Sequence, residues 1–300
     1  MTCRGVYAYH PPNHVLLKAQ HMPNRTKKSI LIILSEHGFW GEKLVCPLEV
    51  FDKAGYTVTF ATPNGRRPVA LPASMDANYI DPAIGRSMTS MEMAEKVKKI
   101  DKSPRLDNSL NISGIMPEMP YFSSTGLLRD LEAYHKAKEK TKIDILSKFD
   151  AVLIVGGSGA IVDLANNQRV HDIILAFVQM DKPVGAQCRS VACLAFAREV
   201  ETRRSVIWGK HVTGPCREYD HHDGTRFAGI DFNMGSPPYP LEYILRDATG
   251  SSGAYIGNFG KETSVIVDYP FLTACSAADS FLTGQKMVEM LEKELRRFGW

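Results

Sequence analysis

Short apolar runs rich in β-branched residues, each followed by a stretch with helical spacing, restrict the fold of this chain more than any other feature. SILIILS at 29–35 is the first such run, and the helical pattern after it ends at Gly55, a residue suited to stop a helix. YTVTFATP at 56–63 is the second run. Because strands that are apolar on both faces are typical of parallel sheets covered by helices, this order predicts a β-α-β unit.

The alternation returns in the second half of the chain. FDAVLIVGG at 149–157 predicts a strand and a glycine turn, and the amphipathic pattern at 163–180 predicts a helix. KPVGAQ at 182–187 predicts a short buried strand, and SVACLAFAREV at 190–200 predicts another helix. We therefore predict an α/β fold with a doubly wound parallel sheet, whose functional loops lie at the carboxyl ends of the strands.

Residues 66–147 interrupt this alternation, because they carry no strong strand signal. Helical patterns occur at 90–100 and 126–140, so we predict a helical insertion that caps the strand ends and shapes a pocket. The predicted organisation is an extended, proline-containing arm at 1–28 and a single α/β domain at 29–300, with the cap insertion at about 66–147. The remaining predicted elements are strands at 204–209, 211–214, 264–268 and 271–275, and helices at 241–250 and 279–300.

The charge and the cysteines limit the classes of function. The formal net charge is +3 over 300 residues, and the basic residues are scattered, so we do not expect nucleic acid as a partner. No apolar run reaches the length of a secretion signal or a membrane span, so we expect a cytoplasmic protein that does not bind membranes. The six cysteines form no CxxC pair and no metal-ligand spacing, which favours reduced thiols and no metal. They are Cys3, Cys46, Cys188, Cys193, Cys216 and Cys275.

Cys188 stands at the corner between the strand predicted at 182–187 and the helix that follows it. A tight turn of this kind exposes a nucleophile. The N–H groups and the dipole at the start of the helix favour the thiolate and stabilise negative charge that develops on a substrate. A free cysteine is also commonly a small buried apolar residue. The position alone leaves both interpretations open.

Four motifs occur in an order that resembles the ThiJ/PfpI superfamily, which has the class I glutamine amidotransferase-like fold. They are GEKLVCPLEVFDKAGYTVTFATPNGRRP from Gly41, VLIVGGSGAIVDL from Val152, KPVGAQCRSVACL from Lys182 and GKHVTG from Gly209. The resemblance covers about residues 29–295, and the insertion favours the branch that contains the glyoxalase III and chaperone proteins. It implies a flavodoxin-like parallel sheet and Cys188 as the elbow cysteine. It also implies that the N–H groups of Gly156 and Gly157 lie beside that cysteine and stabilise an anion.

The chain departs from the family pattern at two positions. A histidine commonly follows the family's cysteine, whereas Arg189 follows Cys188 here. A glutamate of the family, four residues before a proline, hydrogen-bonds the thiol. Lys43 stands four residues before Pro47, and Glu42 is displaced by one residue, which is a rotation of about 100° on a helix. We expect Arg189 and Lys43 to favour a thiolate or to hold an anionic substrate group, although arginine cannot carry a proton.

A proton carrier must therefore come from elsewhere in the chain. His37 lies after the first predicted strand, and Glu218 lies after the HVTG segment, where related proteins often place a third polar partner. Glu42 is a further candidate if the helical turn shifts by one residue. A solvated or structural role is the simpler interpretation of each histidine. Trp40 either lines an apolar pocket or packs between cap and core. Other polar candidates in the same two stretches are Glu36, Asp220, His221 and His222.

Three hypotheses follow for the function. The leading one is a cofactor-independent enzyme of lyase, hydratase or hydrolase type that acts through Cys188 on a small or medium electrophilic metabolite. No cofactor is expected, because the GGSG turn lacks the GxGxxG fingerprint of a dinucleotide site. The second is a protein that keeps the fold but has lost catalytic activity, and that acts as a chaperone or ligand-binding protein. The third is a redox sensor in which Cys188 is oxidised. The resemblance further implies a homodimer.

Overall fold

The computed structural model describes residues 27–81, 85–123, 125–220, 226–227, 230–231, 240–257 and 264–299. Nearly all of the predicted arm at 1–28 lies outside the described residues, as do His221 and His222. Within the described ranges, no helix is long and apolar enough to cross a membrane.

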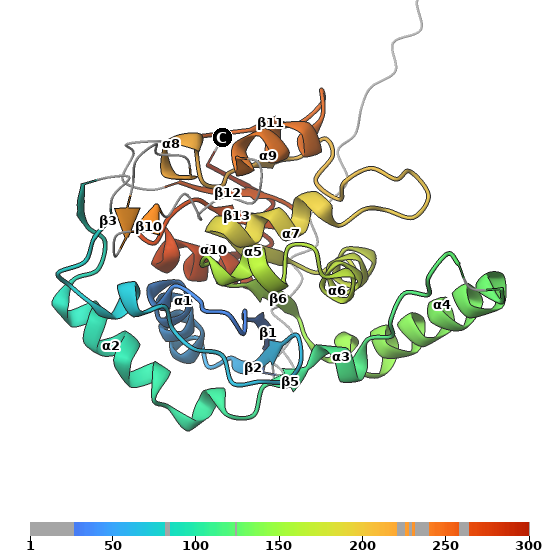
Figure 1. The fold of residues 1–300 in the computed structure, drawn as a ribbon, viewed down its shortest axis with the longest axis horizontal. Coiled ribbons are helices and arrows are strands. Elements are labelled where there is room, and N and C mark those ends of the chain that lie inside the picture. The colour runs from blue at the N-terminus through green and yellow to red at the C-terminus, as the bar shows by residue number, and fades with distance from the viewer. Residues whose placement is uncertain are drawn as a thin grey trace, which may run out of the picture.

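A sheet of eight strands forms the centre of the described chain (Figure 1). In spatial order the strands are β14 (Arg297–Phe298), β12 (Val265–Asp268), β13 (Phe271–Ala274), β7 (Val184–Gln187), β6 (Ala151–Ile154), β1 (Ser29–Ile33), β2 (Thr57–Thr62) and β5 (Leu110–Asn111). From β13 to β5 every neighbouring pair is parallel, whereas β12 pairs antiparallel with β13 and β14. The predicted doubly wound, mostly parallel sheet is confirmed.

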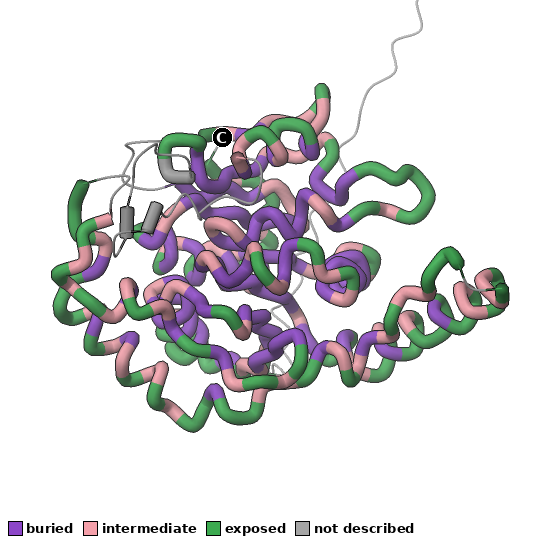
Figure 2. Tube along the Cα trace, viewed as in Figure 1, coloured by how far each residue is buried: buried purple, intermediate pink, exposed green. Residues whose placement is uncertain are grey.

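Helices cover both faces of this sheet, and the alternation within β1 explains why. Ile30 and Ile32 join one apolar core, while Leu31 and Ile33 join the other. The first core is covered by α1 (Gly41–Lys53), α2 (Met91–Asp101) and α10 (Ser280–Glu292). The second is covered by α5 (Gly159–Asp163), α6 (Gln168–Gln179), α7 (Val191–Phe196) and α9 (Leu241–Thr249). Figure 2 shows the buried residues concentrated in the sheet and in the helices against it.

Short elements complete the described chain. They are the 3-10 helices η1 (Pro72–Met75), η2 (Pro104–Leu106), η3 (Leu146–Lys148) and η4 (Cys188–Ser190), the helices α3 (Ile112–Ile115) and α8 (Arg217–Asp220), and three strand pairs. The pairs are β3 (Ile80–Asp81) with β4 (Arg86–Ser87), β8 (His211–Val212) with β11 (Ala254–Tyr255), and β9 (Arg226–Phe227) with β10 (Ile230–Asp231).

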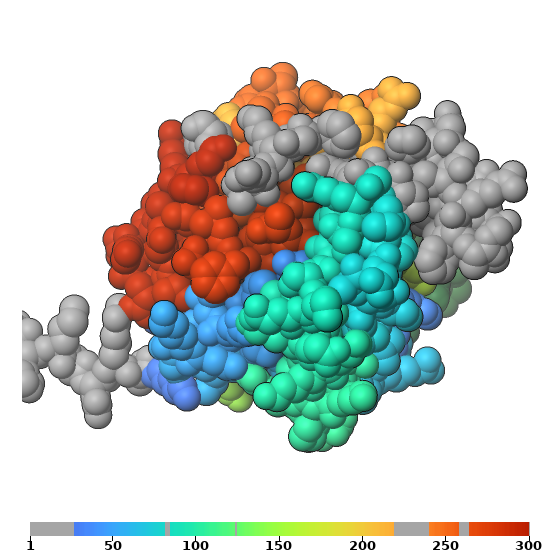
Figure 3. Space-filling model, turned by 90° about the vertical axis from the view of Figure 1, so that its left-hand side faces the viewer, coloured from blue at the N-terminus to red at the C-terminus, as the bar shows by residue number. Residues whose placement is uncertain are grey.

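The insertion at 66–147 contains both predicted helices, α2 and α4 (Leu127–Asp144), but it is not purely helical. Its strand β5 extends the main sheet beside β2, and β3 pairs with β4. These strands have two residues each, which is too short for an alternating pattern to reveal them in the sequence. Figure 3 shows the α2 part of the insertion over the N-terminal part of the chain and beside the C-terminal part.

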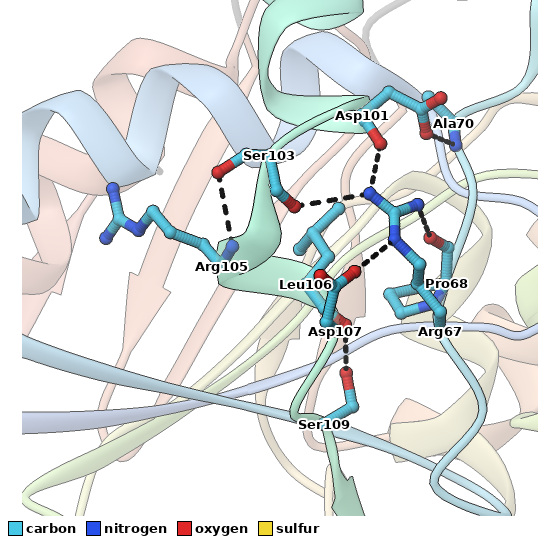
Figure 4. Close-up of polar contacts among 9 residues, drawn as sticks. All are labelled: Arg67, Pro68, Ala70, Asp101, Ser103, Arg105, Leu106, Asp107 and Ser109. Atoms are coloured by element: carbon cyan, nitrogen blue, oxygen red, sulfur yellow. Dashed lines mark hydrogen bonds and ion pairs between the residues drawn. The ribbon is translucent and has the colours of Figure 1, made fainter.

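Arg67, at the start of the insertion, forms hydrogen bonds with the end of α2 and the residues that follow it (Figure 4). Its guanidinium donates to the Asp107 carboxylate at 2.7 Å, to the Ser103 carbonyl at 3.2 Å and to the Asp101 carbonyl. The Asp101 carboxylate in turn accepts from the Ala70 N–H at 2.7 Å. These bonds hold the segment that follows β2 against the end of α2 and the residues after it.

Three of the predicted elements differ most from the structure. The helix predicted at 163–180 begins only at Gln168, as α6, because the Asn167 side chain accepts from the Arg169 N–H at 3.0 Å and caps it. The separate helix α5 ends at Asp163, before this cap. The helix predicted at 279–300 ends at Glu292, and the following chain returns to pair as β14. The strand predicted at 204–209 forms turns, with only a single bridge from Ser205 to Arg198 in the described chain.

Candidate functional site

Cys188 occupies a strained corner at the carboxyl end of β7. Its backbone has φ 52°, in the left-handed region that costs a non-glycine residue about 1 kcal/mol. Ser190 holds the turn, because its Oγ accepts from the Gln187 N–H at 2.9 Å and donates to the Ile154 carbonyl at 2.7 Å. The side chain of Cys188 is half-buried. The structure therefore places Cys188 at a tight corner between the strand β7 and the helical residues that follow it.

The glycine turn after β6 packs directly against this corner. A Cβ on Gly156 would lie 2.1 Å from the Gln187 carbonyl oxygen and 2.9 Å from the Cys188 Cβ. A Cβ on Gly157 would lie 2.7 Å from the Trp40 nitrogen, and the Trp40 N–H donates to the Gly156 carbonyl at 2.9 Å. The N–H groups of the two glycines donate to no other described residue. The turn thus brings Cys188 and the start of α1 together around two backbone donors.

Lys43 lies inside the protein on the first turn of α1, with 4% of its surface exposed. Its Nζ stands 5.7 Å from the centre of the Trp40 ring. Burial raises the pKa of the Asp279 carboxyl, and the positive charge of Lys43 acts against that rise. Lys43, Trp40 and Asp279 therefore belong to one cluster, and no ion pair of Lys43 with another described residue is present.

The insertion brings a tyrosine and a carboxylate near Arg189. Burial and the charge of Asp81 raise the pKa of Tyr79, while the charge of Arg189 acts in the opposite direction. The same segment is fixed to the chain before α1, since the Phe39 N–H donates to the Val69 carbonyl at 3.1 Å. The predicted cap thus reaches the elbow through residues 69–81.

Glu42 lies on a different side of α1 from Lys43. It shares one side of the helix with Cys46 and Glu49. Burial, together with the charges of Glu42 and Glu49, raises the pKa of the Cys46 thiol to about 12. Burial raises the pKa of Glu42 itself to about 7, and the charge of Lys43 opposes this rise. Glu42 can therefore exchange a proton near neutral pH, but no contact joins it to Cys188 within the described part of the chain.

His37 and Glu218 are both exposed. His37 follows β1, two strands from β7 and therefore roughly 10 Å away across the sheet. Its N–H donates to the Ser35 Oγ at 2.9 Å, and its charge acts on the Asp163 carboxyl, whose pKa burial raises. Glu218 lies on α8. Neither contacts Cys188 among the described residues, so both roles stay predictions.

The sequence analysis missed two cysteines that lie near the elbow. Cys275 follows β13, and the register pairs Ala274 with Gln187, so Cys275 and Cys188 are the next residues of neighbouring strands. The thiol of Cys216 lies near that of Cys275 and contributes to the raised pKa of Cys275. The strand predicted at 271–275 already ends on Cys275, but the sequence does not reveal which strand lies beside it. No group of three or more described His, Cys, Asp or Glu residues is arranged to bind a metal.

A doubly wound, mostly parallel sheet with a cysteine at a strand-to-helix elbow defines the class of α/β protein to which this chain belongs. Residues 34–211 match the family model described as ThiJ/PfpI family-like, and the chain belongs to this family. Among curated proteins none matches the chain.

Solved structures support the same fold. The 24 kDa rapid encystment protein of Francisella tularensis superimposes with a TM-score of 0.60 at 17% identity, covering 88% of this chain and 99% of that one. Glyoxalase III from Candida albicans superimposes with a TM-score of 0.57 at 15% identity, covering 87% of this chain and 96% of that one. At these identities the likeness concerns the fold and not the reaction.

Proposed function

We propose that the chain is a cofactor-independent enzyme of lyase, hydratase or hydrolase type, in which the Cys188 thiolate attacks an electrophilic carbon of a small organic metabolite. The left-handed backbone of Cys188 carries this proposal, because a cysteine that only fills space has no need of a strained conformation. Cys193 provides the contrast, since it is fully buried within the regular helix α7.

The surroundings of Cys188 suit a carbonyl substrate. When a thiolate adds to a carbonyl carbon, the negative charge moves to the oxygen and needs hydrogen-bond donors. The N–H groups of Gly156 and Gly157 stand beside the elbow and can supply them. Lys43 and Arg189 add positive charge near this point, which favours a substrate that also carries a carboxylate or phosphate group.

The proton that such a reaction moves needs a group that titrates near neutral pH. Glu42, with a pKa of about 7, has the right chemistry, although it lies on another side of α1 from Lys43. A shift of one residue at the start of α1 on substrate binding would bring it toward the elbow. His37 and Glu218 are the other candidates, and both are accessible to solvent.

Alkylation and a substrate screen test this proposal together. The full chain is treated with iodoacetamide, and each cysteine is followed by peptide mass mapping. Turnover of a panel of anionic and neutral carbonyl compounds is then measured for the wild type, for Cys188→Ala and for the matched control Cys193→Ala. We expect selective alkylation of Cys188 and turnover that only Cys188→Ala abolishes. Turnover that survives Cys188→Ala would contradict the role of the thiol.

A second candidate function is that the protein is catalytically inactive and binds unfolded proteins. Phe122 and Leu128 are 78% and 84% exposed, and Tyr121 beside them is also exposed. Exposed apolar residues at the start of α4 and in the segment before it favour contact with apolar segments of other proteins. Suppression of client aggregation that is lost in Phe122→Asp and Leu128→Asp, but kept in Cys188→Ala, would support this function over the enzyme.

The homodimer and the cytoplasmic location also stay predictions. Light scattering during size-exclusion chromatography measures the first, and a dimer is expected at micromolar concentration. A tagged full-length chain followed by cell fractionation measures the second.

A further inference from the structure

Cys188 and Cys275 end neighbouring parallel strands. The register of β7 and β13 pairs Gln187 with Ala274, so the two cysteines follow one registered pair at the carboxyl edge of the sheet. Neighbouring strands are about 4.8 Å apart. This separation lies within the range of Cα distances, about 4.4 to 6.8 Å, that a disulfide spans.

Cys216 is the second cysteine near Cys275. Thr213 holds this part of the chain on β13, because its N–H donates to the Thr273 Oγ1 at 2.9 Å. The thiol of Cys216 lies near that of Cys275, and the Tyr255 hydroxyl lies near Cys216. Ser264 joins the two segments, because its Oγ is hydrogen-bonded to the Thr213 Oγ1 at 2.8 Å and its carbonyl accepts from the Cys275 N–H at 3.1 Å.

Burial separates the roles of the three thiols. Cys216 and Cys275 are only 2% and 4% exposed, whereas Cys188 is half-buried. The pKa of Cys275 is raised by its interaction with the Cys216 thiol, by burial, and by the charges of Cys188 and Asp279. An oxidant from solvent therefore reaches Cys188 first, while Cys275 stays protonated and shielded beside it.

We propose that these thiols form a relay that stores the oxidation of Cys188 as a disulfide between Cys216 and Cys275. Hydrogen peroxide converts the Cys188 thiolate to a sulfenic acid and releases hydroxide. Cys275 attacks the Cys188 sulfur, and its thiol proton leaves with the sulfenic hydroxyl as water. Cys216 then attacks the Cys275 sulfur, gives its proton to the hydroxide, and displaces Cys188 as a thiolate. One peroxide and two thiols become one disulfide and two waters, and the elbow nucleophile is restored.

The relay extends beyond the proposed enzyme activity, and its test needs no substrate. The full-length protein is treated with a small excess of peroxide, free thiols are blocked with N-ethylmaleimide under denaturing conditions, and tryptic peptides are mapped without reduction. The positions of Lys and Arg place each of the six cysteines on a separate tryptic peptide, so every disulfide is assigned without ambiguity. We expect the Cys216 and Cys275 peptides to be linked, with Cys188 alkylated, and dithiothreitol to reverse the link.

Three variants make the test specific. Cys188→Ser removes the entry point and is expected to slow formation of the Cys216–Cys275 link by about tenfold or more, because the pair is shielded from the oxidant. Cys275→Ser is expected to leave Cys188 to proceed to sulfinic acid. Cys193→Ser, which changes a buried thiol in α7, is expected to leave the link unchanged.

Peptide mapping of the wild type decides the matter even if a variant fails to fold. If peroxide converts Cys188 to sulfinic acid while Cys216 and Cys275 both stay free to react with N-ethylmaleimide, the relay does not exist. Equal rates of linking in the wild type and in folded Cys188→Ser would likewise overturn it, because oxidation would then not enter through the elbow.

Discussion

Gly156 lies so close to the Cys188 corner that a Cβ on it would stand 2.9 Å from the Cys188 Cβ and 2.1 Å from the preceding carbonyl oxygen of Gln187. The glycine turn after β6 and the elbow after β7 are thus in backbone contact. This contact, and not the conformation of Gly156 itself, explains why the position needs a glycine.

Gly156→Ala is therefore expected to displace the elbow. The added methyl group meets backbone atoms, which cannot rotate away, so the variant should lose about 1 to 3 kcal/mol of unfolding free energy. Alkylation of Cys188 should also become less selective. Urea unfolding and the iodoacetamide assay measure the two effects. Gly114→Ala is the control, because a Cβ there lies 3.4 Å from its nearest neighbours. Equal stability of the two variants would contradict the tight contact.

The strain at Cys188 gives a second prediction. In the left-handed region glycine is preferred over alanine, so Cys188→Gly should be more stable than Cys188→Ala by about 1 kcal/mol. In α7 the order should be reversed, and Cys193→Gly should be less stable than Cys193→Ala by about 1 kcal/mol. Thermal unfolding of the four variants measures both differences. The same order at both positions would mean that Cys188 is not held in the left-handed conformation.

The core of the fold was predictable because its strands are short, β-branched and buried on both faces. SILIILS and KPVGAQ correspond to β1 and β7, and Gly55, with φ 75°, follows the end of α1 as predicted. The insertion was harder, since its strands have two residues each and are held in place by long-range contacts. The bonds of Arg67 to the end of α2 are of this kind.

The site was predictable only in part, for a similar reason. A cysteine at a strand-to-helix corner is a local feature, so the position of Cys188 at the end of β7 could be predicted from the sequence. The neighbours of Cys188 depend on the order of strands across the sheet. Cys275 lies 87 positions away along the chain and becomes a neighbour only because β13 pairs with β7. Burial decides the raised pKa of Glu42, and the sequence pattern does not reveal how deeply that side chain is covered.

The pKa of Glu42 predicts a dependence of stability on pH. The folded state holds the proton up to about pH 7, whereas the unfolded state releases it near pH 4.5. The folded state therefore binds more protons between these values, and the unfolding free energy falls as the pH rises through this window. Glu42→Gln removes the effect. As the pH rises from 5 to 8, the unfolding free energy of Glu42→Gln should increase by about 2 kcal/mol relative to that of the wild type.

Urea unfolding at the two pH values measures this gain. Glu49→Gln is the control, because Glu49 is exposed on the same helix and forms an ion pair with Lys96 at 3.1 Å. A pH-independent difference between Glu42→Gln and wild type would mean that Glu42 titrates normally in the folded protein.

The cations near the elbow give the last prediction, which concerns the charge of the substrate. Iodoacetate and iodoacetamide react with thiols in the same way but differ by one negative charge. A buried ammonium near Cys188 should accelerate iodoacetate selectively, because an opposite charge attracts strongly where water is excluded. Lys43→Met should therefore lower the ratio of the iodoacetate rate to the iodoacetamide rate at Cys188 by about tenfold, equivalent to about 1.4 kcal/mol.

Lys96→Met separates this local effect from a change in net charge. Lys96 forms ion pairs with Glu49 and Glu92 on the outer side of α1 and α2, so its loss should leave the ratio unchanged. Arg189→Met tests the second cation in the same assay. If only Arg189→Met lowers the ratio, the anionic group of the substrate binds toward the insertion, where Tyr79 and Asp81 lie. If neither variant lowers it, the positive charges serve the fold, and a neutral carbonyl compound becomes the better choice of substrate.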